Sequence, residues 1–390
     1  MTGAMTFNEP AERVELRAVV ADFASAYGSD YYRARAKEGA YLTELWRGAG
    51  ELGYLGVNLP EEYGGGGGGI GDLAAVLEEL SAAGCPTLMM VVSPAICGTV
   101  LSRFGTTGQR RRWLPGLATG ETIMAFAITE PDAGSNSHRI TTTARRDGDG
   151  WILTGRKTFI SGVDVADAVL VVARIRDEDT GSLSAALFAV PTDTPGFEAR
   201  QIEMDLVSPD HQFQLFMDDV RLPGDALVGD PDAGLLQLFA GLNPERIMAA
   251  SLAAGSARHA LDKAVAYARE RTVWRDRPIG THQGLAHPLA QIKIELEQAR
   301  LMTQHAALRY DSGDDAGAGE AANMAKYAAA EACVRAVDQA VQTLGGNGLA
   351  SEYGLGSAIA AARLARIAPV SREMVLNYVA QQSLGLPKSY

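Results

Sequence analysis

The stretch WILTGRKTFI, residues 151–160, decides the fold class, because it is one of several strand-like segments between residues 124 and 238. These segments are short and rich in β-branched or aromatic residues, and Gly, Pro and Asp separate them. The others are AVLVVARI, LSAALFAVP, FEARQIE and HQFQLFMDDVRL. No pattern of helical length lies between them. We therefore predict an antiparallel sheet or barrel rather than βαβ units.

Helical periodicity flanks this strand region on both sides. VELRAVVADFASAY and AYLTELWRGAGELG have apolar residues at helical spacing, and so does the Ala-rich ERIMAASLAAGSARHALDKAVAYARER. Small residues on the later helices permit close packing in a bundle. The sequence thus predicts an α+β protein with three domains: an N-terminal α-helical domain (1–123), a central antiparallel β-barrel domain (124–238) and a C-terminal domain of four-helix-bundle type (239–390).

Composition excludes several classes of function. The net charge of -12 and the lack of a basic stripe argue against a nucleic-acid surface. Cys85, Cys97 and Cys333 are too widely spaced for a disulfide framework, and the six histidines form no ligand pattern, so no metal is expected. The amino terminus has no apolar signal core and no run of 18 apolar residues follows, so we expect a cytoplasmic protein without a membrane segment.

Two segments of the strand region are candidates for a ligand site. MAFAITEPDAGSNS, residues 124–137, would expose hydroxyl and backbone N–H groups able to grip a polar heterocycle, although TEPDAGS alone could be an ordinary turn. In GRKTFISGVD, residues 155–164, Phe159 and Ser161 fall on the same side of a strand. Such a pair suits a planar cofactor, but also a core aromatic beside a surface serine.

Two further segments lie in the C-terminal helical region. In RERTVWRDRPIGTHQ, residues 269–283, Arg271 offers a planar fork suited to a diphosphate. In QTLGGNG, residues 342–348, Gln342 and the glycines Gly345 and Gly346 would suit the same group. LGGNG is equally a good helix stop.

In this order, the four segments resemble the acyl-CoA dehydrogenase family of flavoproteins, and the resemblance covers nearly the whole chain. LGYLGVNLPEEYGGGG (52–67) and FGTTGQRRRWLPGLATGE (104–121) look like the family's N-terminal signatures, and AFAITEPDAGS and LGGNG like its most specific motifs. The resemblance implies an FAD cofactor and the helix–barrel–helix plan. It also implies loss of an α-proton from an acyl-CoA thioester and transfer of a β-hydride to flavin N5, which gives a trans-2-enoyl-CoA in fatty-acid β-oxidation. Electron-transfer flavoprotein as acceptor and a homotetramer or dimer are implied too.

The resemblance also assigns individual site residues. The segment that meets the flavin ring and the thioester region is matched by Phe126, Ile128, Thr129, Gly134 and Ser135, and Ser135 is also a substrate contact. Phe159 and Ser161 match a pair packed against the isoalloxazine, where the family often has Trp and Thr. Contacts to the FAD diphosphate and adenosine, made across a subunit boundary, are matched by Arg271, Gln283, Gln342, Gly345 and Gly346. The stretch from Arg271 to Gln283 is one residue longer than the family's usual spacing.

The catalytic base needs separate treatment, because many family members place it in a loop that reads EGTS. The matching stretch here is RIAPVSREM, residues 366–374, with Ala368 at the glutamate position. In the branch that resembles isovaleryl-CoA and long-chain acyl-CoA dehydrogenases, the base instead comes from a helix start. In NPERIMAAS, Asn243 would be the N-cap, Pro244 would be N1 and Glu245 would lie in the first turn, where the helix dipole favours a carboxylate.

We therefore predict Glu245 as the base; the alternative is an ordinary acidic residue at a helix start. Arg246 resembles a position near the CoA portion, or else lies on a solvated face. The backbone N–H of Ala368 is expected to stabilise the thioester oxygen. The altered loop leaves two other functions open: a flavin oxidase or monooxygenase of the same fold, and a catalytically silent subunit of a heteromeric enzyme. The acyl group is left open.

Overall fold

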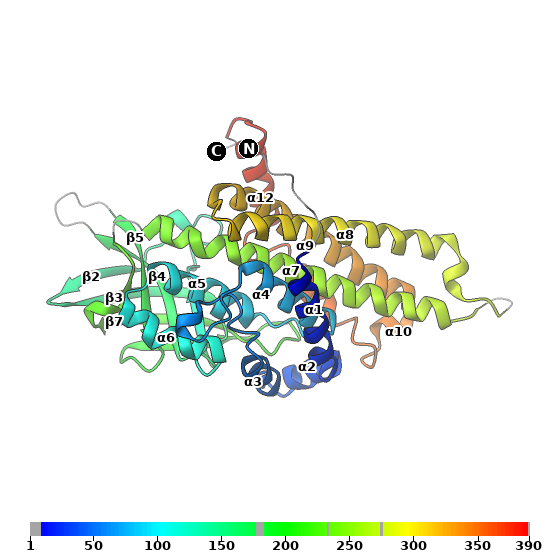
Figure 1. Cartoon of the computed structure of the whole chain (residues 1–390), viewed down its shortest axis with the longest axis horizontal. Coiled ribbons are helices and arrows are strands. Elements are labelled where there is room, and N and C mark those ends of the chain that lie inside the picture. Colours follow the sequence, from blue (N-terminus) through cyan, green and yellow to red (C-terminus); the bar gives the residue numbers. More distant parts are fainter. Residues whose placement is uncertain (1–8, 177–182, 232–233, 274–275, 389–390) are drawn as a thin grey trace.

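The computed structural model describes residues 9–176, 183–231, 234–273 and 276–388. Helices form both ends of the chain and strands form its middle, as predicted (Figure 1). The strands lie at one end of the molecule, and the long C-terminal helices extend away from them. No helix in the described ranges is long and apolar enough to cross a membrane.

The N-terminal region is built from short helices around α4. Its α-helices are α1 (Ala11–Ser25), α2 (Gly28–Lys37), α3 (Thr43–Glu51), α4 (Ile70–Ala82), α5 (Thr99–Phe104) and α6 (Thr107–Thr119). Helix α4 is almost wholly buried and packs against α1 and against the C-terminal helices α7 and α8. Between α4 and α5 lies a buried π-helix, η2 (Val91–Gly98), which packs against α7 and the first strand. This π-helix forms one wall of the site described below.

The central region is one eight-stranded sheet. Its strands are β1 (Met124–Ala127), β2 (Thr143–Asp147), β3 (Gly150–Ser161), β4 (Ala168–Arg176), β5 (Leu183–Pro191), β6 (Phe197–Ile202), β7 (Gln212–Leu222) and β8 (Leu227–Val228). They pair in the order β6-β7-β3-β2-β4-β5-β8, and β1 pairs with β4. The prediction of purely antiparallel pairing is wrong for β1 and β2, which both run parallel to β4. They lie one after the other along the same strand, because the connection between them does not reverse the chain.

Three long helices, α7 (Gly234–Glu270), α8 (Gln283–Asp311) and α9 (Asp315–Leu344), form the C-terminal bundle. Their contact faces are rich in buried alanine, which lets the backbones approach closely. The short helices α10 (Gly346–Leu349), α11 (Ala358–Leu364) and α12 (Arg372–Tyr378) follow. Both α11 and α12 pack against α9.

Helix α7 begins earlier than the sequence suggested. It starts at Gly234, so Asn243 is not its N-cap and Glu245 is not in its first turn. The apolar stretch upstream continues the helix through Pro244, which cannot donate a backbone hydrogen bond. The carbonyl of Ala240, four residues earlier, instead accepts a hydrogen bond from the Tyr310 hydroxyl (3.1 Å). The helix dipole therefore does not explain the properties of Glu245.

Candidate active site

Glu245 is a partly buried acid without a hydrogen-bond partner among the described residues. Burial raises the pKa of its carboxyl group to about 7, against the opposing charges of Arg246 and Lys326. The buried thiol of Cys97, on η2, faces the same carboxylate: burial raises the pKa of Cys97, and Glu245 raises it further. An unpaired carboxyl group with a pKa near neutrality has the properties of a general base.

The π-helix η2 connects the surroundings of Glu245 to the strand β1. The Ser93 hydroxyl accepts a hydrogen bond from the N–H of Met124 (3.0 Å), and the Cys97 thiol donates to the carbonyl of Ala125 (3.5 Å). Residue Phe126, which the sequence assigns to the flavin site, follows directly on this strand and is buried. Through Cys97, the helix η2 thus lies near the base candidate and is hydrogen-bonded to the strand that leads into the TEPDAGS segment.

A buried ion pair fixes the first half of the TEPDAGS segment. The Lys157 ammonium donates to the Ile128 carbonyl (3.0 Å) and to the Glu130 carboxylate (2.9 Å). The N–H of Thr158 donates to the Thr129 carbonyl (2.9 Å), and the Thr129 hydroxyl donates to the Thr158 carbonyl. The Thr129 hydroxyl proton is therefore already used within the chain, which leaves its oxygen as an acceptor.

Glu130 is held from its other side by two threonines. Both hydroxyls and both backbone N–H groups of Thr141 and Thr142 donate to its carboxylate, with distances of 2.6–2.9 Å. Burial favours a higher pKa for Glu130, but the hydrogen bonds from Thr142 and Thr141 and the charge of Lys157 lower it to about 2. This acid is a structural anchor that stays ionised.

Phe159 is presented by an irregularity in β3. The register against β7 shifts between Lys157 and Ile160, and Phe159 takes a left-handed backbone conformation (φ 55°) with 59% of its surface exposed. The simple alternation that placed Phe159 and Ser161 on one side of a regular strand is therefore wrong. The Ser161 hydroxyl is hydrogen-bonded to the Gln212 amide (2.9 and 3.1 Å). Gly134 and Ser135 are exposed nearby in sequence on the turn.

The residues assigned to the diphosphate and adenosine form a separate group at the other end of the bundle. Arg271 follows the last turn of α7, Gln283 begins α8, and Gln342, Gly345 and Gly346 lie at the end of α9. All five are exposed, and no atom lies within 4 Å of where a Cβ would stand on either glycine. From Glu245 to Arg271 the chain follows α7, which at 1.5 Å per residue separates them by roughly 40 Å. Within one chain, the residues assigned to the flavin ring and those assigned to the diphosphate and adenosine therefore lie far apart (Figure 1).

The loop that replaces EGTS differs from expectation in one respect. The N–H of Ala368 already donates to the Leu364 carbonyl (2.9 Å), so the expectation of a free N–H at this position is wrong. Ala368 itself is exposed. The ammonium of the buried Lys326 donates to the Val370 carbonyl two residues further on.

Arg246 does not lie on a solvated face. It is partly buried, and one of its terminal nitrogens donates to the Leu242 carbonyl (3.1 Å). Its Nε is buried and has no hydrogen-bond partner within the part of the chain that the structure describes. A guanidinium with unused donors beside Glu245 has capacity for a further acceptor.

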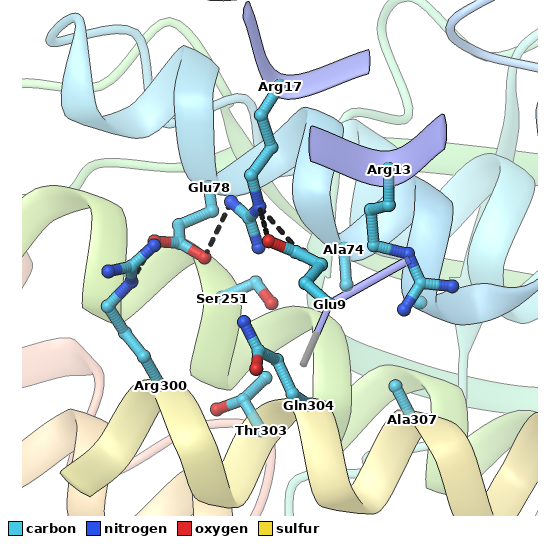
Figure 2. Close-up of a pocket in the computed structure, with 11 residues that line it drawn as sticks. Glu9, Arg13, Arg17, Ala74, Glu78, Ser251, Arg300, Thr303, Gln304 and Ala307 are labelled. Carbon is cyan, nitrogen blue, oxygen red and sulfur yellow. Dashed lines mark hydrogen bonds and ion pairs between the residues drawn. The ribbon is translucent and has the colours of Figure 1, made fainter. Parts of the chain in front are cut away.

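A second group of buried charges lies elsewhere, between α1, α4 and α8 (Figure 2). Arg17 contacts Glu9 (2.8 Å) and Glu78 (2.9 Å), and Arg300 contacts Glu78 (2.6 Å). The cavity that they line has a volume of about 10 Å³, room for one water at most. These residues fasten the first helix to the bundle and do not form a ligand site.

Sequence reasoning missed Lys326, Cys97 and the Glu130–Lys157 pair. Glu130 and Lys157 lie inside the quoted segments, and a charge within a strand otherwise rich in apolar residues could have singled out Lys157. Nothing local distinguishes Lys326 from a lysine on a solvated helix face. Its burial depends on the later helices that cover α9.

Known families and structures match the chain over nearly its whole length. The models of the acyl-CoA dehydrogenase N-terminal, middle and C-terminal domains match residues 10–121, 125–220 and 232–384. The chain is 64% identical over 385 residues to acyl-CoA dehydrogenase FadE12 of Mycobacterium tuberculosis, with 99% of both chains covered.

Two solved structures support the same conclusion. A glutaryl-coenzyme A dehydrogenase in complex with glutaryl-CoA has a TM-score of 0.93 and 30% identity, and the match covers 99% of this chain and 98% of that one. A glutaryl-CoA dehydrogenase from Mycobacterium smegmatis in complex with FADH2 has a TM-score of 0.89 and 28% identity, with 98% and 97% covered. By sequence and by structure, the chain belongs to the acyl-CoA dehydrogenase family.

Proposed function

We propose that this enzyme catalyses the FAD-dependent α,β-dehydrogenation of an acyl-CoA thioester to a trans-2-enoyl-CoA, with Glu245 as the catalytic base. The proposal rests mainly on the state of Glu245: an unpaired, partly buried carboxyl group whose pKa is about 7. The family's alternative position for the base is occupied by Ala368, which cannot accept a proton. Membership of the family supports the reaction class, acyl-CoA dehydrogenation. The local environment of Glu245 supports its assignment as the base.

The described residues fit an FAD cofactor. Phe159 presents an uncovered aromatic ring beside the fixed Ile128–Glu130 segment, as a planar partner would require. Ring contacts are proposed for Phe126, Ile128, Thr129, Gly134, Ser135, Phe159 and Ser161. Gly345 and Gly346 leave open surface where a diphosphate could approach the backbone, next to Arg271 and Gln283 in the bundle end. When bound, FAD supplies the acceptor for the hydrogen and electron pair that leave the β-carbon.

We further propose a homotetramer or dimer, because the two groups of FAD residues lie at opposite ends of α7. One FAD can contact both groups if each group comes from a different subunit. The chain's own separation of roughly 40 Å between Glu245 and Arg271 thus supports shared sites.

In the reaction, the role of Glu245 is to take the α-proton of the thioester. A carboxylate with a pKa near 7 is half ionised at neutral pH and is a stronger base than a solvated glutamate. Arg246 is proposed to contact the CoA portion with its unused donors, and Ser135 and Ala368 to line the thioester region. The reduced enzyme would pass its electrons to a separate electron-transfer flavoprotein.

The test is the Glu245→Gln variant, purified with its flavin and mixed anaerobically with a panel of acyl-CoAs. Flavin content should stay normal, while bleaching should slow by about 10²–10⁴-fold, because the base is lost. Asp262→Asn, which changes an exposed acid on the same helix, is the matched control and should bleach at the wild-type rate. Bleaching of Glu245→Gln at near-normal speed would reject the assignment.

The pH dependence gives a second test. The base must be ionised, so kcat/KM should fall about tenfold per pH unit below a limb near pH 7 and level off above it. A limb near pH 4.5 would mean that the base is a solvated acid. In the same samples, rapid reoxidation by air would identify an oxidase, and a yellow protein that no acyl-CoA bleaches would identify a silent subunit.

A further inference from the structure

Lys326 is a buried cation that contacts the altered loop and has the proposed base among its electrostatic neighbours. It lies on α9 with 2% of its surface exposed, and its ammonium donates to the Val370 carbonyl. The electrostatic neighbours that favour its charged form are Glu245 on α7, Glu373 on α12 and Glu331 on α9; Arg246 on α7 disfavours it. Burial is the largest influence and lowers the pKa of Lys326 to about 8.

The loop that Lys326 contacts is held at its two ends by different groups. At its start, Arg366 forms a two-pronged ion pair with Glu331 (2.6 and 2.8 Å), and its carbonyl accepts from the N–H of Arg372 (2.9 Å). At its end, Val370 is tied to the bundle through Lys326. Between these points Ile367, Ala368 and Pro369 are exposed. The loop's second half is therefore held by the same ammonium that influences Glu245 electrostatically.

We propose that Lys326 is a positioning residue for the reaction: its ammonium holds the 366–371 loop through Val370 and favours the ionised, proton-accepting form of Glu245. The proposal rests on the proposed role of Glu245. Lys326 would make two contributions: a hydrogen bond to the Val370 carbonyl and a positive charge near Glu245. A neutral donor at this position could keep the hydrogen bond but could not favour the ionised form of Glu245. The positive charge of Arg246 on α7 also stabilises the Glu245 carboxylate, so removal of Lys326 weakens this stabilisation without abolishing it.

Two substitutions test the two contributions. Lys326→Gln keeps a hydrogen-bond donor but removes the positive charge. The acidic limb of the kcat/KM profile, which reports the pKa of Glu245, should therefore move to higher pH by roughly one unit. At pH 7 the ionised share of Glu245 would then fall from about one half to about one tenth, so flavin reduction should slow about fivefold. Lys326→Arg keeps the positive charge, so the acidic limb of its kcat/KM profile should lie within a few tenths of a pH unit of the wild-type limb. A limb that does not move in Lys326→Gln would overturn the proposal.

A readout without catalysis separates this inference from the proposed function. The difference in unfolding free energy between a protein and its Glu245→Gln variant, followed against pH, reports the titration of Glu245 itself. A rise of roughly one unit in the folded-state pKa of Glu245 in the Lys326→Gln background should raise this midpoint by about half a unit, because the unfolded-state pKa is unchanged, and should enlarge the total difference. A shifted midpoint in an enzyme whose Glu245→Gln variant is fully active would reject Glu245 as base but keep the coupling. An unshifted midpoint would reject the coupling whatever the activity.

The matched control is Lys263→Gln on α7, since Lys263 also donates to a backbone carbonyl, that of Tyr353 (3.0 Å). It should leave both the limb and the midpoint unchanged. If Lys326→Gln does not fold, the double variant Lys326→Met/Glu245→Gln tests the coupling between the two residues instead, because it removes both charges together. Recovery of folding in the double variant supports the coupling, and failure to recover contradicts it.

Discussion

Two glutamates in this molecule each have a buried lysine among their electrostatic neighbours, yet their carboxyl groups have opposite pKa shifts. Glu130 contacts Lys157 at 2.9 Å and accepts four further hydrogen bonds from Thr141 and Thr142. Its pKa is about 2. Glu245 is influenced by Lys326 but accepts no hydrogen bond among the described residues, and its pKa is about 7. Burial lowers the pKa of both lysines to about 8, but only Lys157 forms an ion pair with its glutamate within the described part of the chain.

The comparison shows that direct hydrogen bonds together with a contacting cation separate an anchor from a base. Five donors around Glu130 hold its charge so firmly that it cannot take a proton near neutrality. At Glu245 the charges of Arg246 and Lys326 offset only part of the effect of burial, so the carboxyl group binds a proton more tightly than a solvated glutamate does. The helix η2 packs against both α7, which carries Glu245, and β1, which leads into the segment that holds Glu130.

The largest expected effect on stability comes from breaking the anchor. Glu130→Ala should lower the free energy of unfolding by about 3–5 kcal/mol, because Lys157 would remain buried without its charged partner. Urea unfolding at pH 7 measures the loss. The double variant Glu130→Met/Lys157→Met should recover most of it. A loss below about 1 kcal/mol for the single variant would show that the pair is not an anchor.

A substitution of Glu245 is expected to raise the free energy of unfolding rather than lower it. The pKa of this group is raised on folding, so its ionised form opposes folding; this cost is absent below about pH 4.5 and complete above about pH 7. Glu245→Gln should therefore be more stable than the wild type at pH 8 by on the order of 1–3 kcal/mol, and the gain should vanish near pH 4.5. Thermal unfolding at the two pH values gives the comparison. A variant that is less stable at pH 8 would contradict the picture of an unpaired acid.

The smallest effect concerns the helix that carries the base. Tyr310→Phe removes the hydroxyl that donates to the Ala240 carbonyl, which Pro244 has left without its helical partner. We expect a loss of about 0.5–1.5 kcal/mol in unfolding free energy. Tyr63→Phe, at a hydroxyl without a hydrogen bond in the described ranges, is the control and should change little. Equal losses in both variants would argue against a specific role for Tyr310.

Sequence periodicity was enough to predict the order of helices, sheet and helices, because it reports which side of each element is buried. It could not predict that β1 and β2 run parallel to β4, since pairing depends on where a connection leads the chain. The start of α7 was misplaced because Pro244 and Asn243 look like a helix start, and a distant tyrosine resolves the ambiguity.

The candidate site was predicted in part for the same reason. Motif residues such as Phe159 could be assigned by resemblance, but the register shift that exposes this ring is a property of β3 and β7 together. The neighbours of Glu245 come from η2 and α9 as well as from α7 itself, and these elements lie far apart in the sequence. Lys326 became visible as a candidate only when these elements were assembled.

The length of α7 has a genetic consequence. This single helix carries Glu245 near its first third and leads into Arg271 at its end, so in the proposed shared site a lesion in either residue would damage a different half. In the assembly proposed above, a subunit with a defective carboxylate could still lend an intact arginine to its neighbour. Two inactive alleles, one altered at each residue, should therefore complement each other in a cell that expresses both.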